Sequence, residues 1–478
     1  MSVILAVARE EWRYWLRSRL AMATALLFLL LLGTTVILTA LRTAQEREHR
    51  LEHQAEAEDS FVSQPERHPH RMVHYGHYAF RAPPPLAVFD PGLDPVTGQS
   101  IFLEGHRQNA AMLAEADASA ELGGLGSLTP AFVYQLFGPL LVILLGYGAM
   151  VRERESSTLS TLLAQGVGGT RLFAGKALAL LGVVLLVLLP LVASTIVAIA
   201  GGESVLAAGL LAGAYFLYLG VWGLLSLLLS TLLRQKATVL AALIGAWLAL
   251  SLLLPNLAVN NVTRAVPMAG RIEVNFEMLA ELRALGDGHN AADPAFARLR
   301  GDLLEEYGVD TVDELPINLR GVVAQYSEAK LTDTLNRYAG QRMEVERRQA
   351  AALQRHGWLT PLLAVATASR AIAGTDLRNH QRFLREAEAL RFDFVQGLNR
   401  LHAEELSYAD DINRSSDAAA EQRTRVAAEN WQLLESFRFE PEDFTSRAAA
   451  AVPALGALAV WFAALAAGAV WTSARVRP

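Results

Sequence analysis

Five residues in the first quarter of the chain form its most metal-like string, His49-Arg50-Leu51-Glu52-His53. The string matches the H-x-x-E-H pattern of inverted zinc peptidases. On a helix, His49 and His53 would share one face and ligate zinc, and Glu52 would act as the general base. No third ligand is specified, and the surrounding segment is highly charged. We therefore expect a solvated helix face and keep a membrane-anchored zinc peptidase as a distant alternative.

A second group of histidines follows closely, and six of the eleven in the chain lie between His49 and His77. Imidazole is a common ligand of transition metals, and short histidine-rich tracts often bind them. A role in folding is the simpler interpretation, so we predict no metal on this chain. The alternative ligand set is His68, His70, His74 and His77.

The pair Gly175-Lys176 raises the question of a phosphate-binding loop. That loop needs Gly, four further residues, and then Gly-Lys-Ser/Thr. Gly169 stands one residue too far from the pair, and Ala177 replaces the hydroxyl. We therefore expect no cofactor and no catalytic residue on this chain.

The polar stretch that organises the chain covers residues 152–176, RERESSTLSTLLAQGVGGTRLFAGK, between two long apolar runs. Its first half predicts a short amphipathic helix, with leucines on one face and charges in the first turn. The glycines that follow end it. Such a helix suits docking into a groove on a partner, and the alternative from the residues alone is an ordinary interfacial loop helix. The residues that we assign to this contact are Arg152, Glu153, Arg154, Glu155, Thr158, Leu159, Leu162 and Leu163.

Composition places these motifs in a membrane protein. The chain has 478 residues, of which 52% are hydrophobic, a net charge of −6 and a mean hydropathy of +0.26. These values fit membrane helices combined with a large soluble portion. The acidic balance argues against a nucleic acid partner. The absence of cysteine excludes disulfides and thiol catalysis.

Hydropathy and loop charge predict six membrane spans with both termini in the cytoplasm, because each short basic cluster then lies inside. Residues 1–19 form a cytoplasmic surface helix, with tryptophans and arginines suited to anionic lipid. Span 1 covers residues 20–41, spans 2–5 lie within 129–254 around the loop 152–176, and span 6 covers 448–474. Residues 475–478 form a cytoplasmic tail.

The two remaining segments, 42–128 and 255–447, are predicted to lie outside the cytoplasm and to pack into one mainly helical domain. We expect residues 45–58 to continue the first span as a helix. Further helices are expected over 100–122, 319–355 and 381–437, and Gly123-Gly124-Leu125-Gly126 marks a turn before the membrane. The predicted fold class is thus an all-α membrane protein with a large extracytoplasmic domain.

No span carries an ionisable residue in its interior, whereas ion-coupled carriers normally need one near the midplane. Energy therefore has to come from another chain. The most polar span residues could line a path or bond between helices. They include Tyr134, Gln135, Tyr215 and Tyr218.

The string Glu153-Arg154-Glu155-Ser156-Ser157-Thr158-Leu159, followed by Leu162-Leu163 and Gly175-Lys176, resembles the coupling loop of type-two ABC exporter permeases. Ser157 stands where that family usually has Gly, and a glycine-rich turn replaces its Pro-led one. Strings such as Trp358-Leu359-Thr360-Pro361 and Phe437-Arg438-Phe439-Glu440-Pro441 resemble the branch with a large external insert of unknown function.

The resemblance implies a permease subunit of an ATP-driven exporter in the inner membrane. Its partners would be a cytoplasmic ATPase, which holds ATP and magnesium, a second permease copy or a similar permease, and membrane lipid. The alternative is a force-transmitting or scaffold subunit that carries no substrate. A dimer contact through the small residues of span 6 is expected; these are Ala463, Ala464, Ala466, Ala467 and Gly468.

The topology can be tested with single cysteines, since the chain has none of its own. We expect Ser63→Cys to react with an impermeant thiol reagent in intact cells. Ser157→Cys should be shielded, because its loop is basic and faces the cytoplasm. Labelling of Ser157→Cys from outside would overturn the arrangement.

Overall fold

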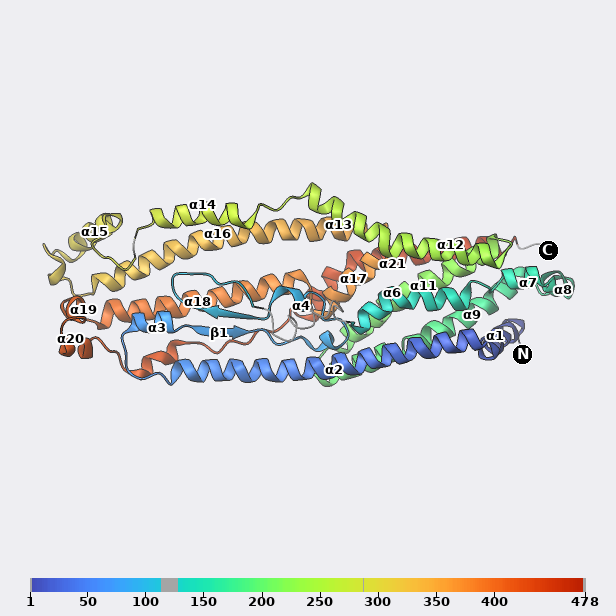
Figure 1. Cartoon of the computed structure of the whole chain (residues 1–478), viewed down its shortest axis with the longest axis horizontal. Helices are drawn as coiled ribbons and strands as arrows, with labels where there is room; N and C mark the ends of the chain where they lie inside the picture. The colour runs from blue at the N-terminus through green and yellow to red at the C-terminus, as the bar shows by residue number, and fades with distance from the viewer. Residues whose placement is uncertain (1, 113–127, 287, 476–478) are drawn as a thin grey trace.

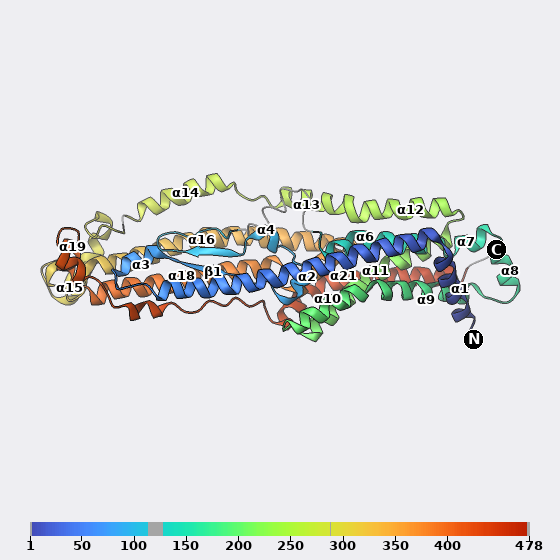
Figure 2. The same ribbon diagram turned by 60° about the horizontal axis from the view of Figure 1, so that its bottom comes forward.

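The computed structural model describes residues 2–112, 128–286 and 288–475. The protein is a long rod with both termini near one end (Figure 1). Apolar helices form a bundle at that end, which we call the membrane bundle. The remaining helices extend away from it as the distal domain (Figure 2). The bundle helices are α1 (Val3–Arg17), α2 (Arg19–Val62), α6 (Pro130–Gly146), α7 (Val151–Glu155), α8 (Thr158–Ala164), α9 (Gly169–Val187), α10 (Leu189–Ala200), α11 (Val205–Leu232), α12 (Lys236–Leu248), α13 (Leu254–Ala265) and α21 (Phe444–Ser473).

Six helical segments of the described residues are long and apolar enough to cross a membrane, which confirms the predicted fold class. Large apolar side chains such as Leu27, Ile37 and Leu189 stand exposed on them. In a bilayer such side chains would face lipid rather than water. The six segments are Arg19–Val62, Pro130–Glu155, Gly169–Ala200, Val205–Leu232, Lys236–Ala265 and Phe444–Ser473.

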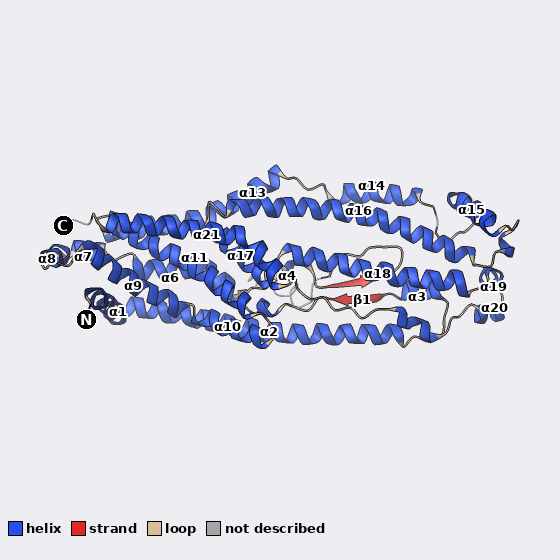
Figure 3. Cartoon of the chain, turned by 180° about the vertical axis from the view of Figure 1, so that it is seen from behind, coloured by secondary structure: helices blue, strands red, loops and turns tan. Residues whose placement is uncertain are grey.

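The distal domain is built mainly from long helices and contains one two-stranded antiparallel sheet (Figure 3). The expected extension of the first span is confirmed, because α2 continues unbroken to Val62. The helix expected over 319–355 is confirmed as α16. The elements of this domain are α3 (Pro69–Tyr75), β1 (His77–Phe80), α4 (Asp94–Thr97), β2 (Ser100–Leu103), α14 (Arg271–Ala284), α15 (Ala297–Tyr307), α16 (Leu319–His356), α17 (Pro361–Ala373), α18 (Leu377–Glu405), α19 (Tyr408–Asn413) and α20 (Ala418–Arg423).

Two helix predictions for this domain were wrong. The segment expected as a helix over 100–122 begins with strand β2, where Ser100 pairs with Phe80 and Leu103 with His77. Residues 113–127, with the expected glycine turn, lie outside the described residues. The helix expected over 381–437 ends at Glu405, and short helices and extended chain follow. In both cases the segment packs against α2 or α3 instead of continuing as a helix. Such tertiary contacts cannot be recognised in a local sequence pattern.

The turn between α16 and α17 enters the membrane bundle, although its residues fall in the segment predicted to lie outside the cytoplasm. Thr360 is 1% exposed, and its hydroxyl donates to the carbonyl of Leu250 over 2.5 Å. That carbonyl lies in a π-helical turn, Ala249–Leu253, where the Leu254 amide bonds to Ala249 instead. The partner one residue further on is Pro255, which has no N–H. Thr360 therefore satisfies a carbonyl that its own helix cannot.

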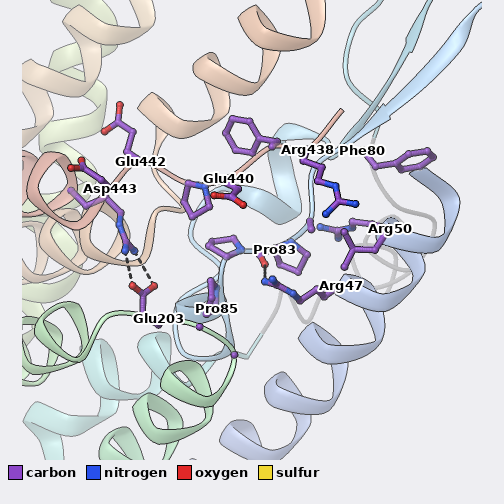
Figure 4. Close-up of a pocket in the computed structure, with 18 of the residues that line it drawn as sticks. Arg47, Arg50, Phe80, Pro83, Pro85, Glu203, Arg438, Glu440, Glu442 and Asp443 are labelled. Atoms are coloured by element: carbon purple, nitrogen blue, oxygen red, sulfur yellow. Dashed lines mark hydrogen bonds and ion pairs between the residues drawn. The ribbon is translucent and has the colours of Figure 1, made fainter. Parts of the chain in front are cut away.

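Other buried polar bonds cross the same junction. Arg447, at the start of α21, donates to the carbonyl of Ile372 in α17 over 2.8 Å and forms two bonds to Glu203 of the bundle, at 3.0 and 2.6 Å. Both side chains line a pocket of about 520 Å³ between the bundle and the distal domain, together with Arg47, Arg50 and Pro83 (Figure 4).

A chain of hydrogen bonds also runs out of the bundle. Gln135 donates to the hydroxyl of Tyr215 over 2.8 Å, and Tyr215 donates to Ser369 in α17 over 3.1 Å. Ser369 in turn donates to the carboxylate of Asp90, in the loop before α4. These bonds connect α6, which carries Gln135, to two segments of the distal domain, α17 and the loop before α4.

The far half of α2 packs against chain that follows much later in the sequence. Glu58 accepts from the amide of Phe437 over 3.0 Å. The indole of Trp431 donates to the carbonyl of Pro65 over 3.3 Å, and the Val426 amide donates to Arg67 over 3.1 Å. Early and late segments thus form one side of the distal domain together.

Replacing Thr360 tests the junction. Thr360→Val keeps the shape and leaves the Leu250 carbonyl without its donor, so we expect about 1–3 kcal/mol less unfolding free energy. Thr360→Ser keeps the hydroxyl and should melt close to the wild type in detergent. Equal melting temperatures for the two variants would show that this bond contributes nothing.

Candidate coupling site

The polar loop lies at the end of the rod opposite the distal domain, beside α1 (Figures 1 and 2). It folds as two short helices, α7 and α8, rather than one. Ser157 joins them with a φ of 59°, in the left-handed region that glycine occupies without steric cost. This positive φ explains why the resembled family usually has glycine at the position of Ser157. Here the Ser156 and Thr158 hydroxyls bond to each other over 2.9 Å beside the strained residue.

A buried charge cluster ties α7 to α1 and α9. Glu11 of α1 is 1% exposed and is paired with both Arg152 and Lys176. Lys176 also bonds to Glu153 over 2.5 Å, and the Arg152 guanidinium lies 3.8 Å from the centre of the Tyr14 ring. Such a cluster is stable only when every charge is paired, so three helices are held in one arrangement.

The next two charges bind the connection between α11 and α12. Arg154 donates to the carbonyls of Leu233 and Thr231, over 2.8 and 3.1 Å, at the C-terminal end of α11. Glu155 accepts from the backbone amide of Lys236 over 2.7 Å, at the first residue of α12. Each charge thus lies at the helix end whose dipole favours it.

The leucine face of the loop is the point where sequence reasoning misassigned a contact. We expected Leu159 and Leu163 to face a partner, but Leu159 is 2% exposed and packs against Met150 and Leu172 of its own chain. Leu162 and Leu163 pack beside it. An amphipathic pattern shows which face is buried, not what buries it. The exposed edge of α8 is instead small and polar, with Ser160, Thr161 and Ala164.

The four polar span residues named as possible pathway lining bond between helices. The Tyr134 hydroxyl donates to the carbonyl of Val187 over 2.6 Å and accepts from the Leu191 amide over 3.1 Å, which bridges the break between α9 and α10. Tyr218 donates to the carbonyl of Gln135 over 2.6 Å. Tyr134, Tyr215 and Tyr218 are fully buried in the chain.

The structure separates the four histidines that were predicted as one alternative metal set. His68 lies beside Asp411, and His77 beside Gln54. Only His70 and His74 remain together, and burial and the neighbouring His106 and His74 lower the pKa of His70 to about 2. Burial also lowers the pKa of His68 to about 4.

The earlier histidine string lies on an exposed face of α2. His49, Glu52 and His53 are all exposed, and the two imidazole ring centres are 6.4 Å apart. His53 bonds to Glu56 over 3.1 Å.

Sequence reasoning missed Glu11 and Lys176 as parts of this site. Glu11 lies in a helix rich in arginine, which we assigned to lipid, and Lys176 was considered for a phosphate loop and as part of the family resemblance, not as a coupling residue. A usable signal was present: Glu11 shares a helix face with Ala8 and Trp15, which are also buried. An acid on the apolar face of a basic helix indicates a buried partner.

Comparison with known families covers nearly the whole chain. Residues 5–283 match the model of the ABC-2 family transporter protein. Residues 275–440 match a domain of unknown function, DUF3526. No curated protein matches the chain.

Neutralising the buried acid tests the charge cluster. Glu11→Gln leaves two cations with weakened pairing, and breaking a buried pair costs about 3–5 kcal/mol. We expect α1 to detach locally and trypsin to cleave at its arginines at least about tenfold faster. The matched control is Glu10→Gln, because the exposed Glu10 pairs with the exposed Arg13 and with no other residue that the structure describes. Equal cleavage of both variants would contradict the role of the cluster.

Proposed function

Because the chain belongs to the ABC-2 transporter family, and is thus a membrane permease subunit of an ABC system, we propose that it couples to a separate cytoplasmic ATPase through α7 and α8. ATP binding and hydrolysis on that partner would move the membrane bundle and drive export. We expect ATP and magnesium on the partner chain. Lys176, which the sequence offered as a phosphate ligand, is engaged by Glu11 and Glu153.

One observation carries this proposal: the polar loop is held from several sides at once. Glu11 connects it to α1, Lys176 connects it to α9, and Arg154 and Glu155 connect it to α11 and α12. An ordinary connector would need none of these bonds. A displacement of α7 by a partner would therefore be passed to four helices without bending the loop.

The exposed edge of α8 is the surface that we propose for the ATPase. Ser160, Thr161 and Ala164 are small and stand clear of the chain. Small exposed side chains allow a groove to approach the helix backbone closely. The leucines beneath these residues would hold the exposed edge of α8 in a fixed position relative to the rest of the loop.

The orientation follows from the same proposal. An ATPase at α7 and α8 places the termini in the cytoplasm and the distal domain on the opposite side of the inner membrane. The exposed apolar residues of α2 would contact lipid. A second permease copy would pack against the exposed side of α21, where Ala463, Ala464 and Ala467 stand outward.

The hydrogen bonds at the junction also favour the alternative function, in which the subunit transmits force to the distal domain. Thr360, Ser369 and Arg447 connect the distal domain to bundle helices that the loop would move, Arg447 through the Ile372 carbonyl of α17. A stroke at α7 would therefore reach that domain whether or not a substrate passes through the bundle.

Substitutions on α8 test the docking surface. The double variant Ser160→Arg/Ala164→Arg adds bulk to the exposed edge only, so we expect at least about tenfold less ATPase to co-purify, with an unchanged melting temperature. Leu159→Asp should lower both, because it places a carboxylate in the buried cluster of Met150 and Leu172.

Ser416→Arg, on an exposed site of the distal domain, is the matched surface control. It should retain the ATPase fully. Undiminished co-purification with the α8 double variant would show that the ATPase binds elsewhere.

A further inference from the structure

Four histidines from three separate segments meet in the distal domain. His70 and His74 lie on α3, His106 follows β2, and His289 lies between α14 and α15. One ring nitrogen of each lies within 4.8 Å of those of the other three. We propose that these four imidazoles form a binding site for a divalent transition metal, for which zinc is the probe. This site goes beyond the proposed transport function and does not depend on it.

The spacing of the nitrogens fits a metal centre. The Nε2 atoms of His70 and His74 are 3.2 Å apart. With zinc–nitrogen bonds of about 2.0–2.1 Å, two ligands of a tetrahedron lie about 3.3 Å apart. The two histidines are separated by one helical turn, so α3 itself sets this distance. Imidazole suits zinc, copper and nickel.

His106 is oriented as a ligand before any metal binds. Its Nδ1 atom lies 3.0 Å from Glu328, and the same carboxylate oxygen accepts from the His106 backbone amide over 3.1 Å. The other ring nitrogen, Nε2, is buried and has no hydrogen-bond partner among the described residues. A carboxylate behind a histidine is the usual support of a metal ligand. Glu328 is itself fixed by Arg391.

The backbone around His106 is shaped for this close approach. The amide of Gly105 donates to the carbonyl of Val73 in α3 over 3.0 Å. A Cβ atom at residue 105 would lie 2.1 Å from a methyl group of Val73, so only glycine fits. His106 follows with a φ of 68°. Glycine and a strained histidine thus bring the loop against the helix that carries His70 and His74.

A second histidine cluster serves as a comparison, because its side chains are bonded to one another and to a carboxylate. His68 and His402 both bond to Asp411, which also accepts from Asn318 over 3.2 Å and pairs with Arg414 over 3.3 Å. Nδ1 of His68 already accepts from the His70 amide over 3.1 Å. The Asp411 carboxylate is therefore saturated by donors within the protein. The four-histidine cluster contains no carboxylate ligand to complete it.

The metal would stabilise the position of α14 and the chain after it, which make few other contacts with the rest of the domain. Helix α14 has no buried residue, and His289 follows it in the chain. The exposed pair Arg337–Glu281 is one of the contacts that connect this helix to α16. A metal bound by His289 and by α3 would join the chain after α14 to the first part of the domain. Four protein ligands leave no open position, so the site would be structural rather than catalytic.

The test measures zinc on the purified full-length protein, prepared with a histidine-free tag and stripped with EDTA. After zinc is added back and excess removed, the wild type should retain about one zinc per chain. His74→Ala/His289→Ala removes two exposed ligands, so the fold should persist while zinc affinity falls at least about 100-fold.

The matched control is His49→Ala/His53→Ala, which removes an exposed histidine pair with the same i, i+4 spacing as His70 and His74. It should keep its zinc. A second measurement is proteolysis between α14 and α15, which zinc should slow in the wild type and in this control but not in His74→Ala/His289→Ala. Absence of stoichiometric zinc in the wild type, or equal zinc in the His74/His289 variant, would overturn the proposal.

Discussion

The junction between the membrane bundle and the distal domain depends on buried polar groups that are paired across it. Arg447 with the Ile372 carbonyl, Tyr215 with Ser369, and Thr360 with the Leu250 carbonyl each join a bundle helix to a segment of the distal domain. An unpaired group at such a place costs more than its bond contributes, because water cannot replace the lost partner. Separating the two parts would therefore carry a large free-energy cost.

Much of the fold could be predicted because its signals are local. The six spans follow from apolar runs, and α16 follows from a long periodic stretch without a helix breaker. The end of α18 at Glu405 could not be predicted, since residues 406–437 pack against α2 instead of continuing the helix. The contacts of Thr360 and α17 with the bundle core could not be predicted either, because they join segments far apart in the sequence.

The candidate sites also depend on tertiary contacts that local sequence patterns do not reveal. The charged run 152–155 is visible in the sequence as a local pattern, whereas its partner Glu11 lies 141 residues before Arg152 and is buried only through tertiary contacts. For the histidines, only the pair within α3 has a local signal. His106 and His289 join that pair because Gly105 admits a close contact and because the chain after α14 returns to α3. Spacing along the chain could not indicate either of them.

The pairing of α2 with the last part of the distal domain has a consequence for how the protein is made. Trp431 meets Pro65 across 366 residues, and Ser436 meets Glu58 across 378. At synthesis rates of about 5–20 residues per second, the far half of α2 waits roughly 20–70 s for these partners. During that time Phe61, which is fully buried in the finished domain, lacks Phe394, whose ring centre lies 5.7 Å from its own. This side of the distal domain can therefore close only after nearly the whole chain has been made.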